Sequence, residues 1–386
     1  NGDAKTVIVD EASMLTEEQL GALIDGIKGV ERFILVGDHR QLPPIGTGRP
    51  FVDIVTFLRP EDVEAIFPRV GKGYTELIVA RRQKQSVDKP ELLDVELANW
   101  YSGAPLSPVA DDIIGDLLRN KNMQRLRLVE WQNANDLIEK MMSVLVEELN
   151  LTGLDDNINF EKSLGGKVVN EYIYFDIKAS EKIENWQILS PVKGYGYGVR
   201  EINRLIQRTF RKKTLQLAFD FKKKKIPQPM GPESIVYGDK VINIINHKRR
   251  KVYSENPAIE PLRYIANGEI GIITGVFRGN YKKWSGELPL NISFSSQPGY
   301  SYVYRKGDFR EEADIPIELA YAITVHKAQG SDFKLVFLIL PNPCQLLSRE
   351  LLYTALTRQK EKLVIFHQGN FWDLKKYSCG EFSETS

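Results

Sequence analysis

A short apolar run that ends in two carboxylates is the feature that most limits what this chain can fold into. Thr6–Val9 is mostly β-branched, and Asp10 and Glu11 follow it directly. A helical stretch over residues 16–27 and a second, largely apolar run over 32–36 come next. Short apolar strands separated by helices predict a parallel sheet buried on both faces. Ligands of such sheets bind at the carboxyl ends of the strands, where the acidic pair lies.

The acidic pair has two interpretations. At the end of a parallel strand, Asp10 could hold Mg²⁺, usually through water. Glu11 could then orient and deprotonate the water that attacks a γ-phosphate. The alternative is a strand followed by a helix whose first turn favours acidic residues. Taken alone, the pair does not decide between the two.

A glutamine-bearing loop follows the second run. Residues 37–46 read Gly-Asp-His-Arg-Gln-Leu-Pro-Pro-Ile-Gly. The amide of Gln41 can donate to phosphate and accept from water, which suits a γ-phosphate sensor, and the prolines stiffen its loop. A Pro-rich surface turn is the alternative. The spacing, one helix and one strand after the acidic pair, favours the sensor.

A polar run near the C-terminus is the third signal. Residues 323–333 read Ile-Thr-Val-His-Lys-Ala-Gln-Gly-Ser-Asp-Phe, and we expect them at the end of a helix over residues 317–328. Thr324, His326 and Lys327 could reach the phosphates of a nucleic acid. The glycine and serine after the glutamine offer backbone N–H groups to an anion. A histidine here would, by itself, more often be structural.

A helix that ends on an arginine is the fourth signal. The sequence predicts a helix over residues 348–358, with Arg358 at its end. An arginine brought across a domain interface can stabilise charge on a transferring phosphoryl group, and lysine is a poorer substitute. An ordinary cation at a helix C-terminus is the alternative.

These four runs, in this order, resemble the motif pattern of superfamily 1 helicases, most closely the RecD-like branch, over residues 6–366. The resemblance implies an α/β fold of tandem RecA-like P-loop NTPase lobes with an inserted small SH3-like β-barrel. It implies that ATP and Mg²⁺ bind between the lobes. We expect a partial first lobe over residues 1–70, a second over 71–231 and 313–386, and the barrel over 232–312.

The resemblance also implies roles for individual residues. Asp10 would hold Mg²⁺ and Glu11 would activate water, while Gln41, Arg82 and Arg358 would contact the γ-phosphate. Arg81 stands where the family usually has an aromatic residue, so which of the two neighbouring arginines acts stays open. The other residues expected at the nucleotide are Gly37, Asp38, Gln329, Gly330 and Asp332. Those expected at the DNA are Pro191, Lys193, Asn203, Thr324, His326 and Lys327.

Two further regions resemble strand-binding parts of the family. The Gly/Tyr-rich loop over residues 189–199 would let backbone approach phosphate or ribose, although a flexible connection is the alternative. Cations near an aromatic residue at 247–251 and 282–284, within the expected barrel, suit a single strand. A solvated loop is as good an interpretation of the 247–251 cluster. The lysine run at 222–225 is more typical of a linker.

One motif of the family does not occur. The chain contains no Gly-x-x-x-x-Gly-Lys-Ser/Thr phosphate loop, and residues 165–168 are the nearest approach. In superfamily 1 that loop precedes the Asp-Glu strand, and nine residues precede Asp10 here. We therefore expect the first motifs of the family upstream of Asn1, and no ATP hydrolysis by this chain alone.

Composition sets wider limits. The hydrophobic share of 42% and the charged share of 27% are those of a globular protein. A net charge of +1 neither requires nor excludes nucleic acid, since cations can gather in one groove. Two distant cysteines, Cys344 and Cys379, argue against disulfides or a zinc cluster and fit a cytoplasmic protein. No apolar run is long enough to cross a membrane.

The sequence therefore predicts an ATP-dependent DNA helicase or translocase. Its expected substrate is single-stranded DNA or a duplex with a single-stranded tail, and the resemblance alone implies 5′ to 3′ movement. Nuclease or recombination subunits are possible partners. A catalytically silent subunit for DNA binding or partner docking is one alternative, and an RNA helicase of the same superfamily is another.

Overall fold

The structure is a computed structural model. It describes residues 4–65, 67–77, 93–104, 115, 118–119, 124–170, 172–220, 226–256, 258–275, 288–310 and 315–384. Arg81 and Arg82 lie outside these residues, as do the 222–225 and 282–284 clusters.

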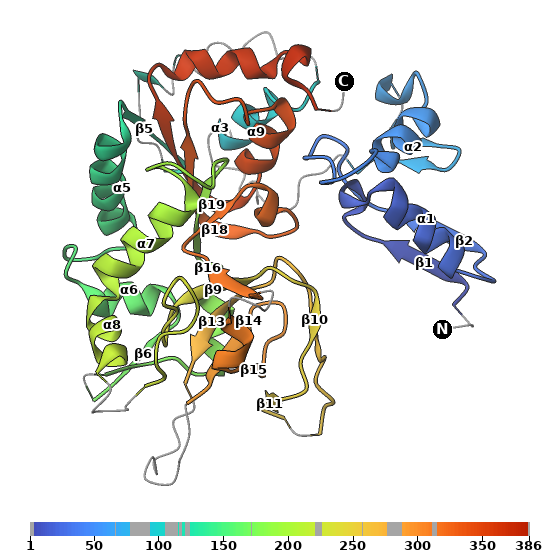
Figure 1. Cartoon of the computed structure of the whole chain (residues 1–386). Coiled ribbons are helices and arrows are strands. Elements are labelled where there is room, and N and C mark those ends of the chain that lie inside the picture. Colours follow the sequence, from blue (N-terminus) through green and yellow to red (C-terminus); the bar gives the residue numbers. More distant parts are fainter. Residues whose placement is uncertain are drawn as a thin grey trace.

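The N-terminal part is a two-stranded parallel sheet with its connecting helix (blue in Figure 1). β1 (Thr6–Val9) pairs with β2 (Arg32–Leu35), and α1 (Glu17–Gly26) lies between them in sequence. Thr16 caps this helix: its hydroxyl accepts from Gln19 N at 3.2 Å, and the Gln19 side chain accepts from Thr16 N at 3.1 Å. The reciprocal cap fixes where α1 begins, seven residues after Asp10.

A five-stranded parallel sheet forms the centre of the second part. Its strands, in spatial order, are β17 (Ala322–Thr324), β8 (Trp186–Ser190), β18 (Phe333–Leu340), β19 (Gln359–Gln368) and β5 (Leu126–Trp131). Its helices are α3 (Leu93–Asn99), α5 (Ala134–Glu148), α7 (Val199–Phe210) and α9 (Arg349–Leu356) (Figure 1). β8 is buried along its whole length, as a parallel strand covered on both faces should be. β1 and β2, for which the sequence predicted the same burial, instead alternate between exposed and half-buried residues, so that prediction is wrong for the N-terminal sheet. The predicted α/β class with a parallel central sheet is confirmed.

A six-stranded antiparallel sheet lies beside the parallel one (Figure 1). Its strands, in spatial order, are β11 (Val252–Ser254), β15 (Tyr300–Tyr304), β14 (Leu290–Phe294), β13 (Ile270–Thr274), β9 (Lys240–Asn243) and β16 (Ile317–Leu319). A short ribbon pairs β10 (His247–Lys248) with β12 (Tyr264–Ile265). The expected antiparallel module is present as a sheet, while its SH3-like character and its boundaries stay predictions.

The remaining elements are short. They are α2 (Pro50–Leu58), α6 (Asn157–Ser163), α8 (Lys212–Phe219), β3 (Val70–Gly71), β4 (Tyr74–Thr75), β6 (Lys167–Val169) and β7 (Tyr172–Tyr174). No helix in the described ranges is both long and apolar enough to cross a bilayer.

The predicted helix over residues 317–328 is wrong. The segment forms β16, then β17, then a 3₁₀ turn, η6 (His326–Ala328). β16 pairs with β9 of the antiparallel sheet and β17 pairs with β8 of the parallel one, so the segment crosses from one sheet to the other. The physical reason is that its apolar, β-branched residues are buried between two sheets, and such residues suit strands. The polar run therefore lies at the carboxyl end of β17, just as the acidic pair lies at the carboxyl end of β1.

Candidate nucleotide and nucleic-acid sites

The acidic pair lies at the carboxyl end of β1, as predicted. Asp10 is exposed and Glu11 is half-buried. Glu11 has a φ of 52°, in the left-handed region that non-glycine residues rarely adopt, and its N–H donates to Asp10 Oδ1 at 2.8 Å. This turn ends the strand sharply and leaves both carboxylates at the edge of the sheet.

The two strand ends of the N-terminal part lie close together. Ala12 N donates to Val36 O at 2.8 Å. A Cβ atom on Gly37 would lie 2.9 Å from Ser13 N and 3.1 Å from the ring of Phe51, so only glycine fits there. Gly37 thus brings the glutamine loop against the segment that follows the acidic pair.

The glutamine loop presents an amide oxygen without a partner. Gln41 Oε1 is buried and accepts no hydrogen bond from any described residue. Buried polar atoms are nearly always paired, so this oxygen is suited to a ligand or water that the loop would receive. Asp38 shapes the loop, because its carbonyl accepts from Gln41 N at 3.2 Å and its Oδ1 from Arg40 N at 3.0 Å.

Three hydrogen bonds join this loop to the second part of the chain. Leu42 N donates to Thr354 Oγ1 at 2.9 Å, and Gln329 Nε2 donates to Leu42 O at 2.9 Å. The hydroxyl of Tyr353 donates to Asp38 Oδ2 at 3.0 Å. We call these three bonds the clasp. Sequence reasoning assigned no role to Leu42, Tyr353 or Thr354, although the last two stand in the motif that ends on Arg358.

The clasp brings the second part up to the acidic pair. A Cβ atom on Gly330, which has a φ of 75°, would lie 4.0 Å from Glu11 Cγ. Arg358 is buried, and its guanidinium donates from Nε to Thr354 O at 3.0 Å and from Nη1 to Ser331 O at 3.3 Å. The structure therefore gathers Glu11, Gly330 and the loop that holds Arg358. Asp332 lies 3.5 Å from Lys360 Nζ on β19.

The residues at the carboxyl end of β1 fit a magnesium ion that takes most of its ligands from water and substrate phosphates. No group of three or more His, Cys, Asp or Glu side chains able to hold a metal occurs in the described part of the chain. Mg²⁺ usually keeps several waters and binds one or two carboxylates together with substrate phosphates. Asp10, exposed at its strand end, can supply such a carboxylate.

A small pocket of about 30 Å³, beside the carboxyl ends of β8 and β17 and next to β9 and β16, collects several residues expected at the DNA. Lys193, Thr324 and Lys327 line it together with Arg200 and Glu318. Lys327 Nζ lies 2.7 Å from Glu318 Oε2, so one of the cations is neutralised in this conformation. We call this feature the basic groove.

The other three residues expected at the DNA are placed differently. His326 is half-buried, and burial lowers its pKa, with the nearby charge of Lys193 acting in the same direction. Pro191 is buried. Asn203 is 1% exposed: its Nδ2 donates to Leu319 O and Ala322 O at 2.9 and 3.0 Å, and its Oδ1 accepts from Ala322 N at 2.8 Å. Its amide thus fixes the crossing between the two sheets and has no atom left for a strand.

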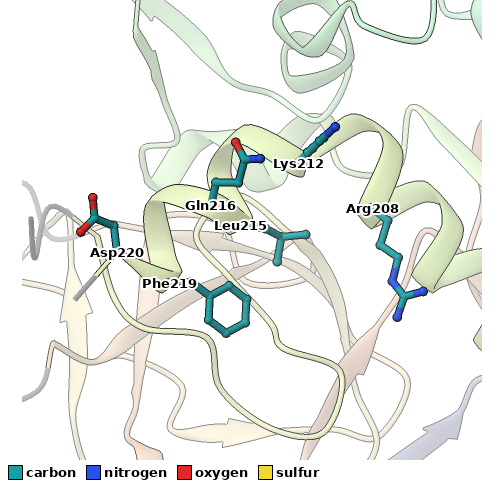
Figure 2. A pocket seen from close by; sticks show the side chains of 6 residues that line it. All are labelled: Arg208, Lys212, Leu215, Gln216, Phe219 and Asp220. Carbon is teal, nitrogen blue, oxygen red and sulfur yellow. The ribbon is translucent and has the colours of Figure 1, made fainter. Parts of the chain in front are cut away.

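A second hollow lies on α7, α8 and the residue after them, and it contains none of the predicted site residues. Figure 2 shows Phe219 and Leu215 between Asp220 on the left and two cations, Lys212 and Arg208, on the right. It is open and shallow, and it borders a segment outside the described residues. It carries no assignment here.

Two protein families match opposite ends of the chain. Residues 1–65 match the family described as an AAA domain, and residues 319–366 match the UvrD-like helicase C-terminal domain. The first match contains the acidic pair and the glutamine loop. The second contains Gln329, Gly330 and Arg358.

Curated relatives match along nearly the whole chain. An uncharacterised protein of Methanocaldococcus jannaschii is 28% identical over 93% of this chain and 28% of its own length. The RecBCD enzyme subunit RecD of Buchnera aphidicola is 24% identical over 93% of this chain and 53% of its own length. The RecD of Haemophilus influenzae is 22% identical over 95% and 51%. The chain thus spans about half the length of these RecD relatives.

The parallel sheets and the clasped motif loops agree with a fold of the helicase type. The family matches at the two ends of the chain and the RecD relatives indicate which group of helicases the chain resembles. These matches make the chain similar to the superfamily 1 helicases, and to RecD subunits among them. Among solved structures, Pif1 of Bacteroides bound to single-stranded DNA aligns over 94% of this chain and 70% of its own, at 16% identity and a TM-score of 0.39. That superposition is too loose to transfer residues or function.

Proposed function

We propose that this chain is the nucleotide-sensing and strand-binding part of an ATP-dependent DNA helicase that moves along a single strand. One observation carries the proposal: the loops of Glu11 and Gly330, from the two ends of the chain, face each other beside the clasped glutamine loop. A nucleotide held between lobes needs contacts from both, and this arrangement offers them.

In the proposed mechanism, Glu11 accepts a proton from the water that attacks the γ-phosphate. Gln41 orients that water through the amide oxygen that now has no partner. Arg358 and Arg82 stabilise charge on the transferring phosphoryl group. A magnesium ion held by Asp10 would neutralise phosphate charge. Closure on ATP and opening after hydrolysis would move the lobes along the strand.

The polar run couples the strand to the nucleotide in this proposal. Thr324 and Lys327 line the basic groove, while Gln329 joins the clasp and Gly330 faces Glu11. The short turn η6 connects the groove residues to Gln329 and Gly330. A movement of Thr324 or Lys327 would therefore change the clasp. Asp38 and Asp332, expected at the nucleotide, act in this proposal by shaping the loops on either side.

Further contacts extend the proposal. Lys248, Arg250 and Lys251, on and after β10, are exposed and would attract phosphates of the same strand. Movement from 5′ to 3′ rests on the resemblance alone. Five of the relatives are named as a subunit of the RecBCD enzyme, which supports a partner subunit of the nuclease or recombination type.

The test of the reaction is ATP hydrolysis by the complete gene product. Glu11→Gln should lower strand-stimulated turnover by about 10²–10⁴-fold, the usual contribution of a general base. Glu18→Gln, an exposed change on α1, is the matched control and should act like wild type. Normal turnover by Glu11→Gln would refute the assignment of Glu11. The 386-residue chain, which has no phosphate loop, should show no turnover above background.

The same assay separates the alternatives. Stimulation by single-stranded DNA above that by RNA of equal length supports the DNA helicase, and the reverse supports an RNA helicase. A complete gene product that binds the strand but hydrolyses no ATP would instead be a silent binding subunit.

A further inference from the structure

The loop between β8 and α7 holds an aromatic ring in solvent. Tyr195 is 76% exposed, and its backbone has a φ of 66°. A bulky residue in this left-handed region costs free energy, and such residues gather at functional sites. The conformation of Tyr195 therefore needs an explanation that burial does not supply.

The exposed ring is supported from below. The rings of Tyr195 and Tyr197 are nearly parallel, with centroids 5.9 Å apart and an interplanar angle of 14°. Tyr197 in turn lies 5.5 Å from Trp131, which is fully buried at the end of β5. Trp131 anchors the stack to the sheet core. One face of Tyr195 thus rests on a supported ring, and the exposure of the residue leaves the other face to solvent.

Cations flank this ring. Lys193 and Arg200, on either side of Tyr195 in sequence, are exposed and line the basic groove. Besides Tyr195, the intervening residues are three glycines, Tyr197 and the half-buried Val199, so the loop offers little apolar surface to a protein partner. Phosphate-binding cations beside an aromatic face are the combination that binds a single strand without sequence preference.

We infer that the outer face of Tyr195 stacks on one base of the single strand that the basic groove binds. The inference rests on the proposed function and adds a base-contacting residue to it. The stack on Tyr197 and Trp131 holds the ring in place, so little side-chain freedom is lost on binding. Because every base has an aromatic face, the contact tolerates any base at that position.

The experiment uses an oligothymidylate that carries one 2-aminopurine at successive positions, with binding and fluorescence measured together. Wild type should quench the probe at one position. Tyr195→Leu should lose that quenching and bind about tenfold more weakly. Its salt dependence should stay unchanged, since no phosphate contact is removed. Tyr195→Phe, which keeps the ring, should keep both the quenching and the affinity.

Two controls make the result specific. Tyr172→Leu removes another exposed tyrosine, on β7 and outside the groove, and should bind like wild type. A strand that lacks the base at the quenched position should bind wild type about as weakly as the intact strand binds Tyr195→Leu.

The outcomes separate the two proposals. The stacking contact is refuted if Tyr195→Leu binds and quenches like wild type, or if Tyr195→Phe loses as much affinity as Tyr195→Leu. A wild-type chain with no affinity for single-stranded DNA or RNA would refute strand binding itself, and the stacking contact with it. Equal melting temperatures of the variants show that the losses do not come from unfolding.

Discussion

The side-chain amide of Gln329 donates a hydrogen bond of 2.9 Å to the carbonyl of Leu42, across 287 residues of sequence. The N–H of the same leucine donates to Thr354, so both of its backbone polar groups are satisfied by the other end of the chain. Leu42 follows Gln41, and Gln329 precedes Gly330. The two loops that flank the candidate nucleotide site are therefore held together by the backbone of one residue.

Removing one bond of the clasp should loosen the N-terminal part. Thr354→Val keeps the shape of a fully buried side chain but leaves the N–H of Leu42 without its acceptor, which costs about 1–3 kcal/mol. Amide hydrogen exchange in β1 and β2 should speed up, while β18 and β19 stay protected. Thr56→Val is the control, because that hydroxyl bonds only within α2. Unchanged exchange in β1 would show that the clasp does not hold the parts together.

Glu318 should limit the affinity of the basic groove. Its ion pair with Lys327 neutralises a cation that could meet a phosphate, so Glu318→Gln should bind a single strand up to about fivefold more tightly. The salt slope should steepen by about one phosphate contact. Glu31→Gln breaks a similar pair with Lys5, outside the groove, and should change neither quantity. Weaker binding by Glu318→Gln would contradict this role.

Lys240 should make stability depend on pH. It is fully buried, its Nζ donates to Trp186 O at 2.6 Å, and burial lowers its pKa to about 7. The unfolded chain keeps this proton up to a pKa near 10.5, so between the two values the unfolded state binds more protons. This group therefore makes the free energy of unfolding rise with pH from about 7 to about 10.

Urea unfolding at several pH values from 7 to 9.5 checks this sign. Lys240→Met should lose the rise that wild type shows, and the difference between the two proteins isolates this group. Lys178→Met, at an exposed position in the turn before β8, should keep the wild-type dependence. Parallel curves for Lys240→Met and wild type would mean that the buried amine keeps its proton in the folded state.

Asn203 should act on the strand without touching it. Asn203→Ala removes three hydrogen bonds to the crossing between β16 and β17, and we expect a loss of about 2–4 kcal/mol of stability. Strand affinity should fall because Thr324 ends β17, while the salt slope stays unchanged, since no cation is lost. Asn135→Ala, on the exposed face of α5, is the control. A reduced slope for Asn203→Ala would instead indicate a direct phosphate contact.

Local signals predicted part of the fold well. Thr16 begins α1 because its capping partner, Gln19, lies within one turn. β1 and β2 are apolar runs with polar ends, so their pattern is readable from a few residues. The helix predicted over residues 317–328 was wrong because the hydrophobicity of this segment suits either a buried helix or two buried strands. Only the neighbouring sheets, built from residues far away in sequence, decide between these.

The candidate site divides in the same way. The carboxylates of Asp10 and Glu11 could be placed, since a strand end determines their position. The clasp could not, because Leu42 uses its backbone, which leaves no signature in residue type. Asn203 was expected at the strand because of the resemblance to the family alone. Asn203 is buried because it supports the crossing between β16 and β17. The periodicity of α7 alone does not reveal that crossing.

At position 11, the left-handed backbone conformation favours glycine for stability, whereas the proposed catalysis requires the carboxylate of Glu11. A glycine there would relieve about 1–2 kcal/mol of steric cost. It would also delete the carboxylate beside Gly330. Glu11→Gly would therefore be selected as a stabilising substitution, although it removes the general base of the proposed reaction. At this position, the substitution that would favour folding is one that the proposed catalysis could not tolerate.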